Sequence, residues 1–256
     1  MELGKIQNIQ DDNWSTLKDF TQARIALGRT GVAIPLKETL QFRLAHAHAR
    51  DAVYSALDLE KLHTEISELG LDYMDVQSEV QSRDEYLKRP DKGRELGGQS
   101  RLQLRQLASN PCDICIVLSD GLSAMAINEN AIPLIQILSQ LSKKMHYSWT
   151  PIVLVDQGRV AVADEIAAIL QASIVIHLIG ERPGLSSSNS LGAYITYHPQ
   201  KGLTDETRNC ISNIRPEGLQ IPIAAEKIMY LVRESLRMGL SGVQLKDTFP
   251  GHLLLD

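Results

Sequence analysis

The sequence predicts an α/β protein with a Rossmann-like open parallel sheet, which has helices on both faces and is preceded by an N-terminal helical segment. Short apolar runs rich in β-branched residues begin after residue 112, and helical patterns separate them. Such alternation is typical of parallel strands that are buried on both faces. The first hundred residues carry helical patterns instead. We therefore expect a helical segment over residues 1–110 and a Rossmann-like domain over residues 111–256.

The strands and helices of the predicted domain follow from local patterns. The expected strands are DICIVL (113–118), PIVLVD (151–156), SIVIHLI (173–179) and AYITY (193–197). The expected helices are NAIPLIQILSQLSKK (130–144), RVAVADEIAAIL (159–170) and AAEKIMYLVRESLRMGL (224–240).

Helical signals also mark the N-terminal segment. Asn13 can cap a short helix from Trp14 to about Arg24. Pro35 suits the first turn of a longer helix with an apolar face formed by Leu36, Leu40, Leu44 and Ala47. Two shorter helices are expected around residues 82–90 and from Ser100 to Ala108.

Composition and charge narrow the class of protein. A chain of 256 residues that is 43% hydrophobic and 22% charged is typical of a soluble globular protein. The net charge of -5 and the lack of a basic stripe argue against nucleic-acid binding. We find no secretory signal and no apolar segment that approaches the roughly 20 residues of a membrane span. The three cysteines suggest reduced thiols in the cytoplasm.

Three loops that directly follow predicted strands are candidates for a ligand site. They are SDGLSAM, DQGRVAV and GERPGLSSSNS, and each contains a glycine and a carboxylate, namely Asp120, Asp156 and Glu181. In an open parallel sheet, ligands bind in the crevice beyond the carboxyl ends of the strands. Each loop alone could be a simple turn or helix cap, but three on one edge predict a crevice.

A fourth polar segment, RNCISNIRPEGL (208–219), is expected in the connection between the last strand and the last helix. It can be a solvated loop. Its two isoleucines suggest partial burial instead, and buried polar groups need partners. A ligand rich in amides would supply them.

Several other motifs do not indicate a functional site. Cys112 and Cys115 form C-x-x-C but precede and enter a strand, so we interpret them as buried structural thiols. His46 and His48 are two residues apart on a helix and point in different directions. Ser123 only half resembles a nucleophile elbow and is better explained as a helix cap. Neither a dinucleotide fingerprint nor a P-loop is present. We predict no metal site and no catalytic residue in this chain.

Taken together, four segments resemble the small (light) subunit of adenosylcobalamin-dependent ethanolamine ammonia-lyase. They are SDGLSA (119–124), GRV (158–160), GERPGLSSSNSLGAYITY (180–197) and RNCISNIRPEGL (208–219). The match continues upstream in RIALGRTG (24–31), FRLAHAHARDAV (42–53) and YLKRPDKGREL (86–96), so it covers the chain from Thr21 onward.

The resemblance implies a carbon-nitrogen lyase that converts ethanolamine to acetaldehyde and ammonia by a radical mechanism. In such a hetero-oligomer, a large TIM-barrel subunit binds ethanolamine and carries the residues that act on it. The small subunit cradles cobalamin at the interface and is inactive alone. The family's cobalamin contacts fall on Val160, Glu181 and Cys210 in this sequence. Corrin bears peripheral amides, so Glu181 can accept their N–H groups and the Val160 backbone can pair with another. Cys210 offers a small, polarizable wall.

Two departures from the family pattern bear on this reading. The segment before Thr21 is shorter than the extension by which some members are packaged in bacterial microcompartments, which argues for a cytoplasmic location. Asp156 and Gln157 precede GRV and could change local contacts to the corrin. Two alternatives stay open: a non-catalytic scaffold for assembly of the complex, and a stand-alone nucleotide-binding enzyme.

Overall fold

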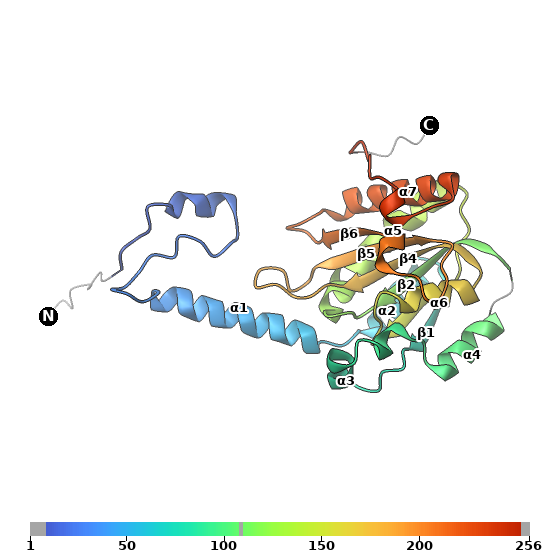
Figure 1. The fold of residues 1–256 in the computed structure, drawn as a ribbon, viewed down its shortest axis with the longest axis horizontal. Helices are drawn as coiled ribbons and strands as arrows, with labels where there is room; N and C mark the ends of the chain where they lie inside the picture. Colours follow the sequence, from blue (N-terminus) through green and yellow to red (C-terminus); the bar gives the residue numbers. More distant parts are fainter. Residues whose placement is uncertain (1–8, 108–109, 252–256) are drawn as a thin grey trace.

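The computed structural model describes residues 9–107 and 110–251, and its centre is a six-stranded sheet in the order β1-β3-β2-β4-β5-β6 (Figure 1). The strands are β1 Tyr73–Gln77, β2 Cys112–Ser119, β3 Ile152–Asp156, β4 Ala172–Gly180, β5 Leu191–Tyr197 and β6 Arg208–Ile214. The helices are α1 Leu36–Tyr54, α2 Leu59–Glu68, α3 Arg83–Lys88, α4 Gly98–Leu107, α5 Ala124–Lys144, α6 Val162–Ile169 and α7 Ile221–Met238.

The sheet is mixed, which corrects the prediction of an open parallel sheet. The strands β1, β3, β2 and β4 are parallel, whereas β5 pairs antiparallel with β4 and β6 antiparallel with β5. The reason lies in the connection from Glu181 to Ser190, which contains no helix. A parallel neighbour needs a long crossover that returns the chain to the end of the sheet where the previous strand began. A short loop instead starts the next strand beside the end of the strand before it, so that the two strands run antiparallel.

Two strands were not predicted. The segment that contains Cys210 was expected to be a loop, yet it forms β6, whose Ile211 and Ile214 are buried while their neighbours face outward. The strand β1 lies within the segment expected to be helical, and only Val76 of its residues is buried. Both strands lie at the edges of the sheet, where short runs with little apolar character leave a weak signal. The domain division at residue 110 stays a prediction. One strand of the sheet, β1, lies before this residue in the sequence.

Helices cover both faces of the sheet, as expected. On one face, α2, α5 and α7 pack against the strands around a core that includes Ile66, Leu134 and Ile228. On the other face, α4 and α6 contribute Leu104 and Ile166 to a second core. The helices expected after Pro35 are therefore present, and α2 is an additional one. Ala108, the expected end of the helix that forms α4, lies outside the described residues.

The helix α1 projects away from the sheet and its covering helices (Figure 1). Its C-terminal end is anchored to the helices around the sheet, where Ala52 is buried and the Val53 carbonyl accepts a hydrogen bond of 2.7 Å from Arg83 Nε. Its N-terminal half contacts the preceding segment, where Arg24 Nη2 donates to the Glu38 carbonyl at 2.6 Å. The predicted apolar face exists but is uncovered: Leu36, Leu40 and Leu44 are 71%, 54% and 57% exposed. Before α1, the expected helix from Trp14 to Arg24 is a shorter 3-10 helix, Ser15–Phe20.

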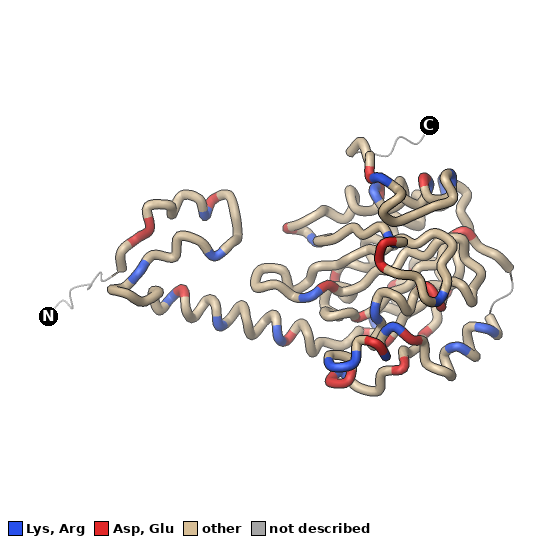
Figure 2. Tube along the Cα trace, in the orientation of Figure 1, with Lys and Arg blue, Asp and Glu red and all other residues tan. Residues whose placement is uncertain are grey.

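Lys and Arg residues are interspersed with Asp and Glu residues along the Cα trace (Figure 2). Within the described ranges they form no long run of one sign. None of the helices described is both long enough and apolar enough to span a lipid bilayer.

Candidate ligand-binding crevice

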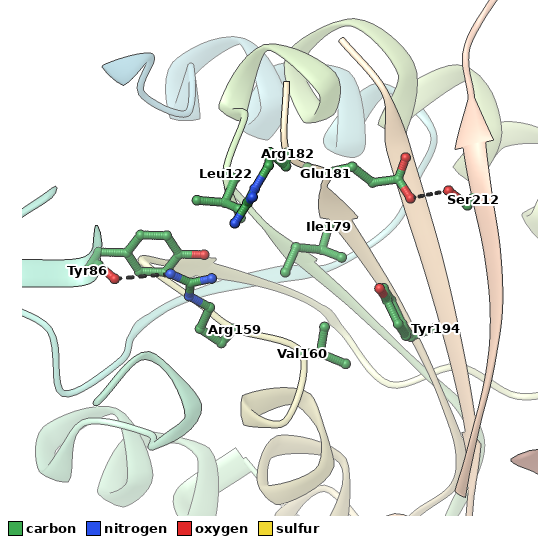
Figure 3. A pocket seen from close by; sticks show the side chains of 11 residues that line it. Tyr86, Leu122, Arg159, Val160, Ile179, Glu181, Arg182, Tyr194 and Ser212 are labelled. Atoms are coloured by element: carbon green, nitrogen blue, oxygen red, sulfur yellow. Dashed lines mark hydrogen bonds between the residues drawn. The ribbon is translucent and has the colours of Figure 1, made fainter. Parts of the chain in front are cut away.

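The three loops that the sequence placed together do meet, at the carboxyl ends of β2, β3 and β4. They enclose part of a cavity of about 410 Å³ (Figure 3). The strands β5 and β6 and the helix α3 complete its wall. The lining residues are Tyr86, Gly121, Leu122, Arg159, Val160, Ile179, Gly180, Glu181, Arg182, Tyr194 and Ser212. The crevice therefore lies where an α/β sheet is expected to bind a ligand.

Glu181 lines this cavity, but its carboxylate already has protein partners. The hydroxyl groups of Ser212 and Ser190 donate to Oε1 and Oε2 at 2.5 and 2.6 Å, and the Asn213 N–H donates to Oε2 at 3.1 Å. The carboxylate thus joins the end of β4 to the start of β5 and to β6. Because two carboxylate oxygens offer about four lone-pair sites, one acceptor position is left.

Val160 also lines the cavity, and a buried histidine holds its carbonyl group. His177 Nδ1 lies 3.1 Å from the Val160 carbonyl oxygen, and its Nε2 lies 2.7 Å from Ser119 Oγ. A carbonyl can only accept, so Nδ1 carries the proton and Nε2 accepts from the serine hydroxyl. Burial lowers the pKa of His177 from 6.5 to about 4, which keeps the ring neutral.

We predict that this histidine makes stability depend on pH. The unfolded chain takes up a proton below about pH 6.5, whereas the folded protein resists protonation down to about pH 4. The free energy of unfolding should therefore fall by about 2 kcal/mol from pH 7 to pH 5 through this group. Denaturant unfolding at both pH values should show that the change in free energy of unfolding differs by about 2 kcal/mol between the wild type and His177→Asn, whose amide can still donate to Val160.

A second buried group, Asp120, changes stability with pH in the opposite direction. Burial raises the pKa of Asp120 from 3.8 to about 7, against the opposing effect of Arg83. Asp120 therefore reduces stability as the pH rises from about 4 to 7. Because the wild type and His177→Asn share Asp120, the difference between their pH profiles isolates the histidine. An equal change in the free energy of unfolding between pH 7 and pH 5 in both proteins would contradict the assignment.

The three carboxylates of the crevice loops have different environments. Asp120 is buried beside the cavity and pairs with Arg83 Nη1 at 2.9 Å. Asp156 is exposed and does not line the cavity, although Gln157 donates to it at 3.3 Å. Of the three, only Glu181 is placed to contact a ligand in the cavity.

Tyr86 brings α3 against the GRV segment. Its hydroxyl donates to the Gly158 carbonyl at 3.1 Å, and burial raises its pKa well above the usual range, so it stays protonated. The Arg159 guanidinium lies over its ring, 4.2 Å from the centroid. Tyr86 is about seventy residues from that segment in sequence. The sequence does not predict its place in the site, although Tyr86 begins YLKRPDKGREL, one of the segments that carry the family resemblance.

Cys210 is not among the residues that line the cavity. It lies on β6 opposite Tyr194, which does line the cavity. The residue as a whole is exposed, but burial of its thiol raises the pKa of Cys210, against the opposing effect of a hydrogen bond with Tyr194. The structure therefore places Val160 and Glu181 together in the lining of the cavity, whereas Cys210, on β6, lies outside that lining.

The polar side chains of the 208–219 segment find partners within the protein, which corrects the expectation that a ligand would supply them. Arg208 forms a buried ion pair with Asp164. Asn209 donates to the Gly242 carbonyl at 3.1 Å, and Arg215 Nη1 donates to the Ser186 carbonyl at 3.0 Å. These three side chains tie β6 to its surroundings and do not line the cavity.

Cys115 and Ser123 have structural roles, whereas Cys112, which was also expected to be a buried thiol, is only partly buried. Cys115 is fully buried in β2, and burial raises its pKa to about 12. Ser123 occupies the N-cap position of α5, but its hydroxyl donates to the Ser188 carbonyl at 2.6 Å and so fastens the 181–190 loop. Over residues 9–107 and 110–251, no group of three or more His, Cys, Asp or Glu side chains could hold a metal ion.

These features define a class: an α/β protein with helices on both faces of a mixed sheet and a polar crevice at the carboxyl ends of its parallel strands. Comparison with known proteins then identifies the family. The family described as "Ethanolamine ammonia-lyase light chain" matches residues 11–246. The chain therefore belongs to the ethanolamine ammonia-lyase small-subunit family.

Individual relatives agree with this assignment. The ethanolamine ammonia-lyase small subunit of Pseudomonas putida (strain W619) is 48% identical over 247 residues, which are 95% of this chain and 91% of the relative. That of Pseudomonas fluorescens (strain SBW25) is 49% identical over 243 residues, which are 94% of this chain and 88% of the relative. A small subunit implies a larger partner subunit within a lyase complex.

Proposed function

We propose that this chain is the cobalamin-cradling subunit of an ethanolamine ammonia-lyase that converts ethanolamine to acetaldehyde and ammonia. The observation that carries the proposal is the crevice, where Glu181 and the Val160 segment meet at the carboxyl ends of the strands. Bound adenosylcobalamin would supply the carbon-centred radical that starts the reaction. This chain would hold and orient it.

The residues present fit one edge of a corrin. A cavity of about 410 Å³ suits part of such a molecule, so the rest would lie outside this chain, against the large subunit. Leu122 and Ile179 give the cavity apolar walls. Glu181 keeps one acceptor position for a peripheral amide N–H, in a charge-assisted hydrogen bond.

The other two proposed contacts have different relations to the cavity. The Val160 carbonyl is occupied by His177, so its N–H is the backbone group left to pair with an amide oxygen. Cys210 would contact the part of the cofactor that extends beyond the cavity, past Tyr194. Its thiol would act as a small, polarizable wall rather than as a reactive group.

The uncovered face of α1 supports a role in assembly. Leucines at positions 36, 40 and 44 lie on one side of a helix that has little contact with the rest of its own chain. Contiguous exposed apolar side chains mark interaction sites. We assign this face to the large subunit, which we expect to be a TIM barrel that binds ethanolamine and carries the catalytic groups.

Co-expression with an ethanolamine ammonia-lyase large subunit tests the proposal. A tagged form of this chain should retain the large subunit through purification, and the complex should release acetaldehyde from ethanolamine only when adenosylcobalamin is added. Each subunit alone should be inactive. A complex without cobalamin-dependent product would contradict the enzyme assignment and leave the scaffold alternative.

A further inference from the structure

Two arginines line the crevice without a carboxylate partner. Arg159 and Arg182 both contribute to the cavity wall. Among the residues that the structure describes, no acidic side chain lies within 4.0 Å of either guanidinium group. Arg83, in contrast, lies 2.9 Å from the Asp120 carboxylate. The cavity lining thus carries two guanidinium groups and one carboxylate, that of Glu181, which forms no ion pair with either arginine.

Arg159 is held in place by contacts that leave part of its guanidinium free. Its backbone N–H donates to the Gly93 carbonyl at 2.7 Å, and its Nη2 donates to the Tyr86 carbonyl at 3.2 Å. Its Nε is enclosed and lacks a partner. Within the described part of the chain, Nη1 has no protein acceptor either. A fixed, partly buried cation with unused donors favours an anionic ligand.

The two polar ends of the cavity have opposite character (Figure 3). The Glu181 side chain points toward Ser212 on β6, whereas the Arg182 side chain, from the next residue, points the other way, toward Tyr86 and Arg159. One end can accept N–H groups, and the other can donate to anionic oxygens. A single ligand that bears both amides and an anion would match this arrangement.

We propose that Arg159 and Arg182 form an anion site that binds the phosphodiester of the cofactor's nucleotide tail. The inference rests on the proposed function, because the ligand is cobalamin. The planar guanidinium group pairs with phosphate oxygens through two parallel hydrogen bonds, which fixes orientation as well as charge. The two arginines would thus set which edge of the corrin faces Glu181.

The test compares three ligands on the reconstituted complex. Adenosylcobalamin has the phosphodiester and the nucleotide base, adenosylcobinamide phosphate has a phosphate but no base, and adenosylcobinamide has neither. Affinity is measured by titration calorimetry or by the change in corrin absorbance. Arg182→Gln should weaken binding of the two phosphate-bearing ligands by roughly tenfold to a hundredfold and change binding of adenosylcobinamide by less than about threefold.

Arg182 is the primary position because it is exposed and has no protein hydrogen bond among residues 9–107 and 110–251, so its loss should not disturb folding. Arg159→Gln should show the same ligand pattern. Arg105→Gln is the matched control, since it removes an equal charge from an exposed position on α4. Arg182→Lys should recover part of the affinity, because it restores charge without the planar fork.

Each other outcome decides against the anion site. Equal losses for all three ligands, or no loss for any, would overturn it. So would an unchanged affinity for every ligand combined with weaker subunit association by sedimentation, because the arginines would then face the large subunit. If the wild-type complex binds none of the three ligands, the proposed function itself fails.

Discussion

Replacing Glu181 with glutamine is expected to weaken adenosylcobalamin binding by the complex about tenfold to a hundredfold. A charge-assisted hydrogen bond contributes about 1.5–3 kcal/mol, and the substitution removes the charge while keeping the shape of the side chain. The glutamine amide also cannot accept every donor that the carboxylate accepts. The Asn213 N–H and a corrin amide N–H would compete for its one oxygen.

A control is needed because Glu181 also joins β4 to β5 and β6. Ser190→Ala removes one of the donors to Glu181 Oε2 but keeps the carboxylate and does not alter the cavity lining. We expect this variant to change cofactor affinity by less than about threefold. Unchanged affinity and turnover in Glu181→Gln would favour the scaffold alternative. Equal losses in the two variants would show that the carboxylate acts only as a structural link.

Replacing Gly180 with alanine is expected to destabilise the protein by about 3 kcal/mol or more, which corresponds to a fall of roughly 6–12 °C in Tm. A Cβ at this position would lie 2.0 Å from the Ser123 carbonyl oxygen and 2.5 Å from that of Asp120. These are backbone atoms of the turn after β2, and they cannot move away without displacing the start of α5.

The neighbouring turn explains why the contact is so close. Gly121 has φ 56°, and a Cβ there would lie 2.2 Å from the Gly180 carbonyl oxygen, which also accepts the Leu122 N–H at 2.9 Å. The two loops meet backbone to backbone beside the cavity. Gly98→Ala is the matched control, because nothing lies within 4 Å of that Cβ at the start of α4. Thermal unfolding that places Gly180→Ala within 1 °C of this control would contradict the packing argument.

The central part of the fold could be predicted from local patterns. The runs DICIVL, PIVLVD and SIVIHLI became β2, β3 and β4, because continuous apolar runs are buried on both faces wherever they occur in a sheet. The position of the crevice followed from these strands, since the carboxyl ends of parallel strands lie at the same end of the sheet. The edge strands β1 and β6 could not be predicted, because their half-exposed sequences resemble loops.

The candidate site was predictable only in part. Glu181 directly follows β4 and Val160 lies in the loop after β3, so the predicted topology brings both loops to the cavity. Tyr86 and His177 could not be foreseen. Tyr86 comes from a different part of the chain, and His177 is part of an apolar strand whose pattern gives no indication that its ring holds the Val160 carbonyl.

By itself, the sequence determined which segments are the central buried strands, most of the helices that cover them, where the strand-end loops gather, and the family resemblance that comparison confirmed. The tertiary structure decided the antiparallel direction of β5 and β6, the exposure of the α1 face, and the partners of each polar group in the crevice. The physical reason is the separation in sequence of the residues that interact. Burial patterns are set by neighbouring residues, whereas strand direction, helix docking and hydrogen-bond partners depend on contacts between residues far apart in the chain.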